Sequence, residues 1–205
     1  MPQFLLIVAG VGACLFWVLQ ERPYIAPRPY IKAVMAICLG LYCFIVPHAP
    51  IIAMTTGFLL CAIGDFALDL PEDKGFLPGL GAFLLGHIAF CVFLWPFATW
   101  APMLCAVIAL FSAGFFLWLR PALDAALRLP VLFYSGIIAL MGMTAFTTDL
   151  SSPLIPLGAG LFIASDVVLA VQRFKREFPF GMSVNWVLYA SGQICLALGA
   201  VGSQV

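Results

Sequence analysis

The sequence predicts an all-α integral membrane protein with eight transmembrane helices, forming a single domain over residues 1–205. The first reason is composition: 64% of the residues are hydrophobic, only 9% are charged, and the mean hydropathy is +1.14, which excludes a water-soluble globule. The second reason is that the apolar residues form eight runs, each near the roughly 20 residues needed to cross a bilayer. The third is that the connections between the runs are too short to hold a soluble domain.

The eight predicted helices follow one another along the chain with proline or glycine near their borders. They cover residues 4–20, 30–46, 50–68, 78–95, 101–119, 130–147, 154–173 and 183–203. Because proline lacks a backbone N–H, we interpret the prolines near these borders as breaks between helices rather than kinks within them. The fifth connection, 120–129, is flanked by proline and is compatible with a short interfacial helix.

All nine Lys and Arg residues lie at the odd-numbered connections, counted along the chain, and none lies at the even-numbered connections or the termini. They are Arg22, Arg28, Lys32, Lys74, Arg120, Arg128, Arg173, Lys175 and Arg176. Because cationic loops stay in the cytoplasm, both termini are predicted on the non-cytoplasmic side. We expect a multi-pass protein of a bacterial inner membrane rather than of a eukaryotic endomembrane. The net charge is zero and no basic run resembles a nucleic-acid patch, so nucleic acid is not an expected partner.

Two stretches of the sequence resemble each other and predict a parallel repeat of four helices plus four. Residues 57–70 (GFLLCAIGDFALDL) and 158–171 (GAGLFIASDVVLAV) place an aspartate at the same position, Asp65 in one and Asp166 in the other. Parallel repeats are related by an axis along the membrane normal, and the functional site lies between them. The two aspartates are then expected to face each other across that axis.

Other polar residues recur at matching places in the two halves. One helix after each aspartate comes a small-Gly-polar-Ile element, LLGHIAF around His87 and ASGQICL around Gln193. Lys32 lies 33 residues before the first aspartate, and Tyr134 lies 32 residues before the second. Tyr189, one helical turn before Gln193, points the same way as that glutamine.

These polar residues fall in the cytoplasmic half of the predicted bundle and form the candidate site. Its members are Asp65 and Asp166 as catalytic candidates, with Lys32, His87, Tyr134, Tyr189 and Gln193 around them. An ionisable group in the hydrocarbon costs at least about 2.5–3.5 kcal/mol, so the two aspartates should face the bundle interior. Structural roles stay open for the others, since lysine also serves as an interfacial anchor, histidine as a core residue and tyrosine in the aromatic belt. Asp69 and Asp149 are read as loop-end carboxylates, and His48 as a structural loop residue on the opposite side.

No metal and no cofactor is expected. A zinc hydrolase site needs three or four N, S or O ligands, and the only two histidines, His48 and His87, are predicted to lie apart. His87 with the two aspartates would make only a sparse site. The seven cysteines show no paired spacing and are expected to be small packing residues.

At these residues the chain resembles the YhhN family of membrane proteins, whose animal members are the TMEM86 lysoplasmalogenases. The matching elements are Lys32 after a proline-containing loop, Gly64-Asp65, FLLGHIAF around His87, FIASD at 162–166, Tyr189 and Gln193. The resemblance covers essentially the whole chain and implies hydrolysis of the vinyl ether bond of lysoplasmalogens. The products would be a fatty aldehyde and glycerophosphoethanolamine or glycerophosphocholine, with the two motif aspartates as the catalytic pair. The family is also considered distant kin of metal-dependent hydrolases such as alkaline ceramidases, whose metal site needs more histidines than this chain has.

The chemistry of a vinyl ether is compatible with two carboxyl groups. Cleavage requires an acid that protonates the β-carbon and a carboxylate that stabilises the cation and activates water. Asp166, deeper and farther from Lys32, is predicted to be the acid, and Asp65 the base. The other candidates would position water and the ether oxygen, and Lys32 or a cytoplasmic arginine would meet the phosphate of the lysophospholipid. Two alternatives remain open: a small proton-coupled transporter and a non-catalytic lipid-binding protein.

Overall fold

The computed structural model describes residues 2–46, 52–71 and 74–203, and the whole of this part folds as one bundle of helices. Apolar runs of this length form helices in lipid because the helix satisfies every backbone hydrogen bond internally. The eight α-helices of the described residues are α1 (Pro2–Leu19), α2 (Arg28–Ile45), α3 (Ile52–Leu68), α4 (Phe76–Leu94), α5 (Pro102–Leu119), α6 (Ala125–Phe146), α7 (Leu154–Phe174) and α8 (Gly181–Gly202). Two 3₁₀ turns, η2 (Trp95–Phe97) and η3 (Arg120–Ala122), follow α4 and α5.

The predicted all-helical membrane fold is confirmed. Within the described residues, seven helices are long and apolar enough to cross a membrane, and α3, with 17 residues, is just shorter. The prediction extended that span to residue 50, but residues 47–51, including His48 and two prolines, lie outside the described part. The seven cysteines are free, and Cys38, Cys43, Cys61 and Cys91 are buried among apolar side chains.

One local prediction is wrong. Residues 120–129 do not form a separate interfacial helix, because α6 begins at Ala125 and includes Pro130 as its sixth residue. A proline inside a transmembrane helix removes one hydrogen bond but does not end the helix, since the surrounding apolar medium penalises an open backbone more. Other prolines do lie where breaks were predicted, such as Pro29 and Pro102 in the first turns of α2 and α5.

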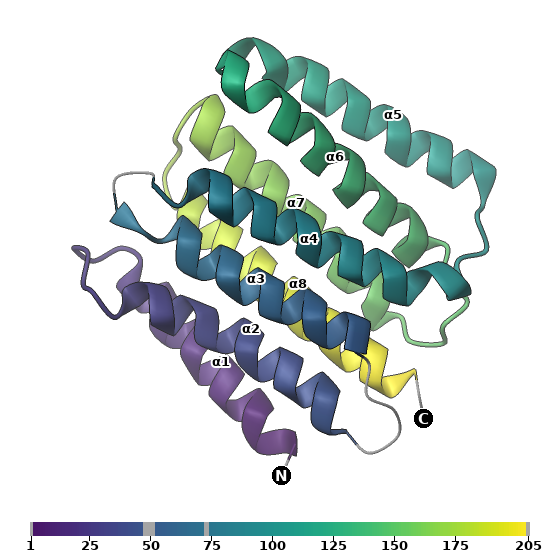
Figure 1. The fold of residues 1–205 in the computed structure, drawn as a ribbon, viewed down its shortest axis with the longest axis horizontal. Helices are drawn as coiled ribbons and strands as arrows, with labels where there is room; N and C mark the ends of the chain where they lie inside the picture. Colours follow the sequence, from purple (N-terminus) through teal and green to yellow (C-terminus); the bar gives the residue numbers. More distant parts are fainter. Residues whose placement is uncertain (1, 47–51, 72–73, 204–205) are drawn as a thin grey trace.

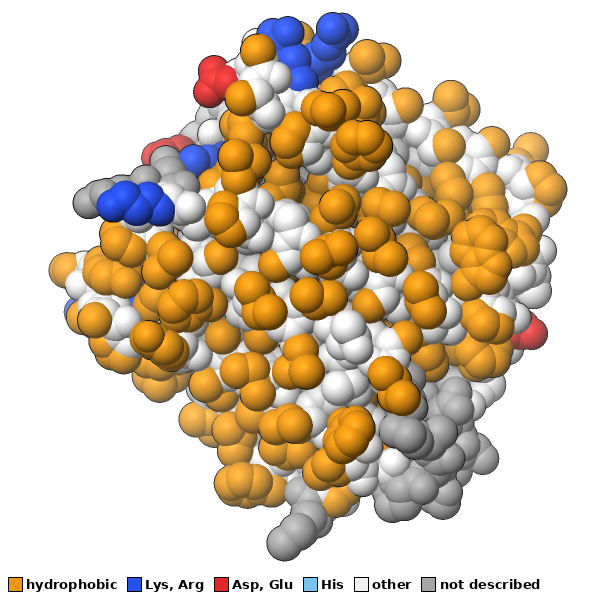
Figure 2. Space-filling view, in the orientation of Figure 1, with side chains coloured by type: hydrophobic (Ala, Val, Ile, Leu, Met, Phe, Trp, Pro, Cys, Tyr) orange, Lys and Arg blue, Asp and Glu red, His pale blue; other side chains and the backbone are white. Residues whose placement is uncertain are grey.

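The helices run back and forth with their axes nearly aligned, and both termini lie at the same end of the bundle (Figure 1). The connections α1–α2, α3–α4, α5–α6 and α7–α8 lie at the other end. Figure 2 shows apolar side chains across the visible face and Lys and Arg gathered at its upper and left margin. The Lys and Arg residues, which lie at every second connection along the sequence, therefore gather at one end of the bundle in space.

α8 lies in the middle of the bundle, where it packs against α7, α2, α1 and α3. Its neighbour α7 approaches very closely, because a Cβ atom on Gly192 would lie 2.9 Å from the carbonyl oxygen of Gly158. The pair α3 and α4 has the same arrangement: a Cβ atom on Gly86 would lie 3.1 Å from the carbonyl oxygen of Gly57. Small residues that let helix backbones approach are typical of packing in membranes. These two close helix pairs hold the polar residues described next.

Candidate active site

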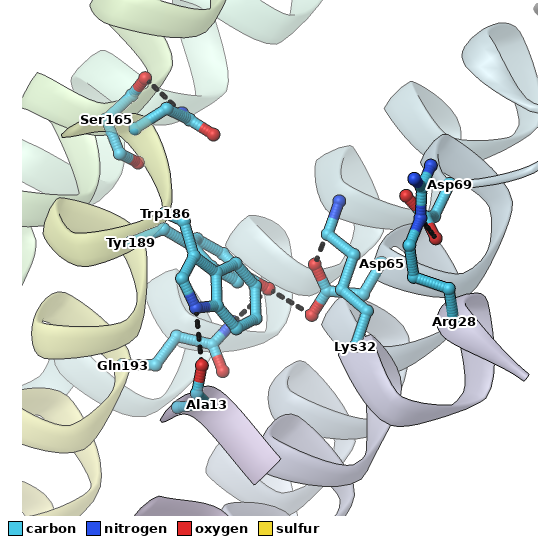
Figure 3. Close-up of polar contacts among 10 residues, drawn as sticks. Ala13, Arg28, Lys32, Asp65, Asp69, Ser165, Trp186, Tyr189 and Gln193 are labelled. Carbon is cyan, nitrogen blue, oxygen red and sulfur yellow. Dashed lines mark hydrogen bonds and ion pairs between the residues drawn. The ribbon is translucent and has the colours of Figure 1, made fainter. Parts of the chain in front are cut away.

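Asp65 lies near the cationic end of α3 and is almost fully buried, with 1% of its surface exposed. Its Oδ2 accepts a hydrogen bond of 2.7 Å from the hydroxyl of Tyr189 on α8, and its Oδ1 lies 3.9 Å from Nζ of Lys32 on α2 (Figure 3). One turn farther along the chain, Asp69 pairs with Nε of Arg28 at 2.9 Å. Two ion pairs one turn apart therefore join α2 to α3, and the inner one belongs to a buried carboxylate.

Asp166 lies just past the middle of α7 and has a different partner. Its Oδ2 accepts a hydrogen bond of 2.6 Å from the hydroxyl of Tyr134 on α6. Both side chains are only half-buried, since they face a cavity in the bundle. Asp166 lies eight residues before the end of its helix, about 12 Å along the axis, whereas Asp65 lies three residues before the end of α3, about 4.5 Å. The two aspartates thus differ in depth and in the charge of their partner.

A chain of hydrogen bonds extends from Asp65 into the core. The Tyr189 hydroxyl donates to Asp65 and accepts a hydrogen bond from Nε2 of Gln193, one turn along α8 (Figure 3). Tyr189 and Asp166 line the same cavity. The tyrosine ring is enclosed by Phe162, Trp186 and Phe83, with ring centroids at 5.1, 5.6 and 5.8 Å.

His87 on α4 is fully buried behind Tyr134. Its Nδ1 lies 2.7 Å from the carbonyl oxygen of Phe83; because a carbonyl only accepts, Nδ1 carries the proton and Nε2 is an acceptor. Among the described residues, neither Nε2 of His87 nor Oε1 of Gln193 has a hydrogen-bond partner. Two positions that match in the predicted repeat therefore both hold a buried acceptor.

A cavity of about 730 Å³ brings most of these groups together. Five of the seven candidate residues line it: Lys32, Asp65, Tyr134, Asp166 and Tyr189. His87 and Gln193 do not line it and instead lie behind the two tyrosines. Toward the cationic end of the bundle the cavity is bordered by Glu21, Arg173 and Glu177, and elsewhere its walls are mainly apolar.

Comparison with known proteins gives the family. The sequence profile of the YhhN family matches residues 27–200, which include every candidate site residue. The chain belongs to the YhhN family. Among its relatives is a protein of Mycobacterium bovis named lysoplasmalogenase, 33% identical over 154 residues, which cover 71% of this chain and 59% of the relative. Rat lysoplasmalogenase TMEM86B is 30% identical over 96% of this chain and 82% of its own length, and the human protein of that name is 28% identical over 85% and 76%.

The predicted resemblance to this family is confirmed by these matches. The chain spans about three fifths of the length of the mycobacterial relatives that it matches. No solved structure matches the chain.

The candidate donors do not fit a metal site of three or four protein ligands. The two aspartates are engaged by tyrosine hydroxyls, and Asp65 also by Lys32. Across the part of the chain that the structure describes, no group of three or more His, Cys, Asp or Glu side chains could hold a metal ion.

Sequence reasoning missed two residues of α8 at the cavity. Trp186 donates its indole N–H to the carbonyl of Ala13 at 2.9 Å, which ties α1 to α8 beside Tyr189. Asn185 donates to the carbonyl of Ser165 at 2.7 Å, next to Asp166. A signal was present, because Asn185, Tyr189 and Gln193 repeat every four residues and therefore share one face of the helix.

Proposed function

We propose that this member of the YhhN family hydrolyses the vinyl ether bond of lysoplasmalogens, releasing a fatty aldehyde and glycerophosphoethanolamine or glycerophosphocholine. The observation that carries this proposal is that Asp65 and Asp166 line one largely apolar cavity and that, of these two, Asp65 alone has an ion-pair partner among the described residues. The names of the bacterial and mammalian relatives support the same activity.

The different partners of the two aspartates suit them to different roles. The ammonium group of Lys32 favours the carboxylate form of Asp65, whereas Asp166 has no ion-pair partner among the described residues and its apolar surroundings favour the uncharged acid. The hydrogen bond from Tyr134 is made to Oδ2, so Oδ1 of Asp166 is left to carry the proton toward the substrate. This is the division of roles predicted from the sequence.

The reaction then follows in two stages. Asp166 gives its proton to the β-carbon of the vinyl ether, and the resulting oxocarbenium ion is stabilised by the charge of Asp65. Water adds to the α-carbon as Asp65 takes its proton, which forms a hemiacetal. Asp65 then protonates the glycerol oxygen, the carbon–oxygen bond breaks, and the hemiacetal hydroxyl returns a proton to Asp166. Both carboxyl groups end in their starting protonation states. Tyr189, itself bonded by Gln193, holds Asp65 in place, and His87 packs behind Tyr134.

The cationic end of the cavity is the proposed place for the head group. Arg173 lies seven residues after Asp166 on α7, about 10 Å along the helix axis, and also borders the cavity. A glycerol backbone and a phosphate fit this separation, with the phosphate meeting Arg173 or Lys32. The lysophospholipid would thus present its head to the membrane surface that the cationic loops define, which we propose is the cytoplasmic one.

We also propose that the two halves of the chain are a parallel repeat. Lys32 and Asp65 join the second and third helices of the first half, and Tyr134 and Asp166 join the same helices of the second. The close glycine contacts between α3 and α4 recur between α7 and α8. The packing of α2 against α8 likewise has its counterpart in α6 against α4.

The test of the hydrolase is aldehyde release from a vinyl-ether lysophospholipid by purified protein in detergent with a chelator present. The saturated alkyl-ether lipid and the Asp166→Asn protein run beside it, and Asp149→Asn, at the other end of the bundle, is the matched control. Aldehyde from the vinyl ether only, lost with Asp166→Asn and kept with Asp149→Asn, is the expected result. Absence of aldehyde under every condition would refute the proposal and favour the transporter.

A further inference from the structure

Beside the two aspartates, the cavity continues as an apolar arm between α5, α6 and α7. The wall from α5 is formed by residues that recur at helical spacing on one face: Val107, Ile108, Phe111, Phe115 and Leu119. α5 is otherwise the most exposed helix, and Leu119 is its single buried residue. A helix that mostly faces lipid therefore turns one face to the cavity.

The two serine hydroxyls of the arm donate their hydrogen bonds within the protein. Ser112 on α5 donates to the carbonyl of Ser135 at 2.9 Å, and Ser135 on α6 donates to the carbonyl of Val131 at 2.8 Å. Both donors are thus used within the protein, and the remaining wall is hydrocarbon. An apolar occupant loses no hydrogen bond in this arm, whereas a polar one would lose its bonds to water.

On α5, Phe115 and Leu119 lie toward the cationic end, because Arg120 follows directly. From the level of Asp166 the rest of the arm extends away from the head-group end, along Ile108 and Phe111. The bond between Ser112 and Ser135 sets the middle of α5 beside Tyr134, at the level of Asp166. From Tyr134, α6 continues for eight residues to Gly142, about 12 Å farther from the cationic end. The vinyl ether includes the first two carbons of the hydrocarbon chain. With that bond at the aspartates and the head group at Arg173, the rest of the chain must leave in this direction.

Three helices converge at the far end of the arm, around Gly142. A Cβ atom on Gly142 would lie 2.9 Å from Cδ1 of Ile163 on α7, 3.8 Å from Cγ2 of Ile108 on α5 and 3.9 Å from Cδ2 of Phe146. Ile108, Phe146 and Ile163 all line the cavity. Gly142 does not itself line the cavity but lies directly behind these side chains, so a side chain at position 142 would push them into the arm.

We propose that the arm binds the alkenyl chain of the substrate and that Gly142, with Ile108 and Ile163, determines how long a chain is accepted. This assignment rests on the proposed hydrolase function and adds the chain selectivity of the same site. A leucine at position 142 would displace about three methylene groups of a long chain. Because each buried methylene contributes about fourfold to affinity, the preference for long over short chains should fall at least about tenfold.

The test compares Gly142→Leu with Gly136→Leu, a change on the same helix at a position where a Cβ atom meets nothing within 4 Å. Aldehyde release is measured on octenyl and hexadecenyl lysophospholipids, and the ratio of their kcat/KM values is the readout. We expect Gly142→Leu to keep activity on the octenyl lipid and to lower the hexadecenyl-to-octenyl ratio at least about tenfold, with no change for Gly136→Leu. If Gly142→Leu does not fold, Ile108→Phe is the second variant, because it changes a residue of the exposed helix α5. It should also lower the hexadecenyl-to-octenyl ratio.

A ratio that stays unchanged in both Gly142→Leu and Ile108→Phe would overturn the tail assignment. Binding of the saturated alkyl-ether lipids of both lengths separates this outcome from failure of the hydrolase. If the wild-type protein releases no aldehyde but Gly142→Leu selectively weakens binding of the hexadecyl lipid, the hydrolase is wrong and the tail site stands. If wild type and Gly142→Leu each bind the octyl and hexadecyl lipids equally well, the proposed tail site is wrong.

Discussion

Replacing Lys32 by methionine removes the ammonium group beside Asp65 and keeps an unbranched side chain of similar length. The two charges are separated by 3.9 Å, and the side chains are 14% and 1% exposed. With an effective dielectric constant of about 20, a pair at this distance is worth about 4 kcal/mol. Breaking one partner of a buried pair typically costs about 3–5 kcal/mol, which agrees with that value.

The charge of Asp65 is what the proposed reaction uses, so the loss should appear in kcat. Because about 1.4 kcal/mol corresponds to a factor of ten in rate, Lys32→Met should lower kcat by about a hundredfold to a thousandfold. KM should change much less, since Arg173 remains at the cavity to meet the phosphate and the effect is on a group that acts during the reaction. The assay is aldehyde release from a vinyl-ether lysophospholipid over a range of substrate concentrations.

Arg28→Met is the matched control, because Arg28 forms the neighbouring ion pair with Asp69 one turn away. Asp69 does not line the cavity, so loss of this second pair should leave kcat within about threefold while removing a similar contact between α2 and α3. Thermal unfolding in detergent would show whether the two variants lose comparable stability. Retained kcat in Lys32→Met, or an equal loss in Arg28→Met, would refute the reasoning.

Three further predictions concern the site and its scaffold. Measured on the small residual activity at high enzyme concentration, Asp65→Asn should lack the acid limb of the pH–rate profile and Asp166→Asn the alkaline limb; the same limb lost in both variants would contradict the division of roles. Tyr189→Phe removes the donor to Asp65 and leaves Gln193 unpaired, so kcat should fall about tenfold to a hundredfold with the fold intact by circular dichroism. Gly192→Ala places a Cβ atom 2.9 Å from backbone atoms of α7 and should destabilise the protein by about 1–3 kcal/mol, whereas Gly114→Ala, with open space around it, should leave the unfolding temperature unchanged.

The helices could be predicted from the sequence because hydropathy and length determine what can cross a bilayer. The borders of α5 and α7 agree with the predicted runs to within one residue. Pro130 was wrongly predicted to separate two helices. In water a helix that breaks at proline can bond its free backbone groups to solvent, but in lipid it cannot, so α6 continues through Pro130.

The contacts of the site could be predicted only within each half. Spacing of about 33 residues brings Lys32 near Asp65 and Tyr134 near Asp166, because antiparallel neighbouring helices return to the same level. The bond from Tyr189 to Asp65 joins residues 124 positions apart, and no local pattern indicates which helices meet there. The arm lined by α5 could not be predicted either, since that helix is apolar on every side and hydropathy does not distinguish its cavity face from its lipid face.

The two halves are proposed to be similar, but the cavity at the aspartates opens toward the second half because the outermost helices pack differently. In the first half α1 packs extensively against α2 and also touches α8, where the Trp186 indole bonds to Ala13. Its counterpart α5 makes a smaller contact with α6, and the space that this leaves is the apolar arm. The residues facing the two aspartates differ in the same way, lysine in the closed half and tyrosine in the open half. A repeat would supply two carboxyl groups at equivalent positions. The lysine beside one of them would make it a charged base. The looser packing of α5 would set the other, as an uncharged acid, beside the lipid chain.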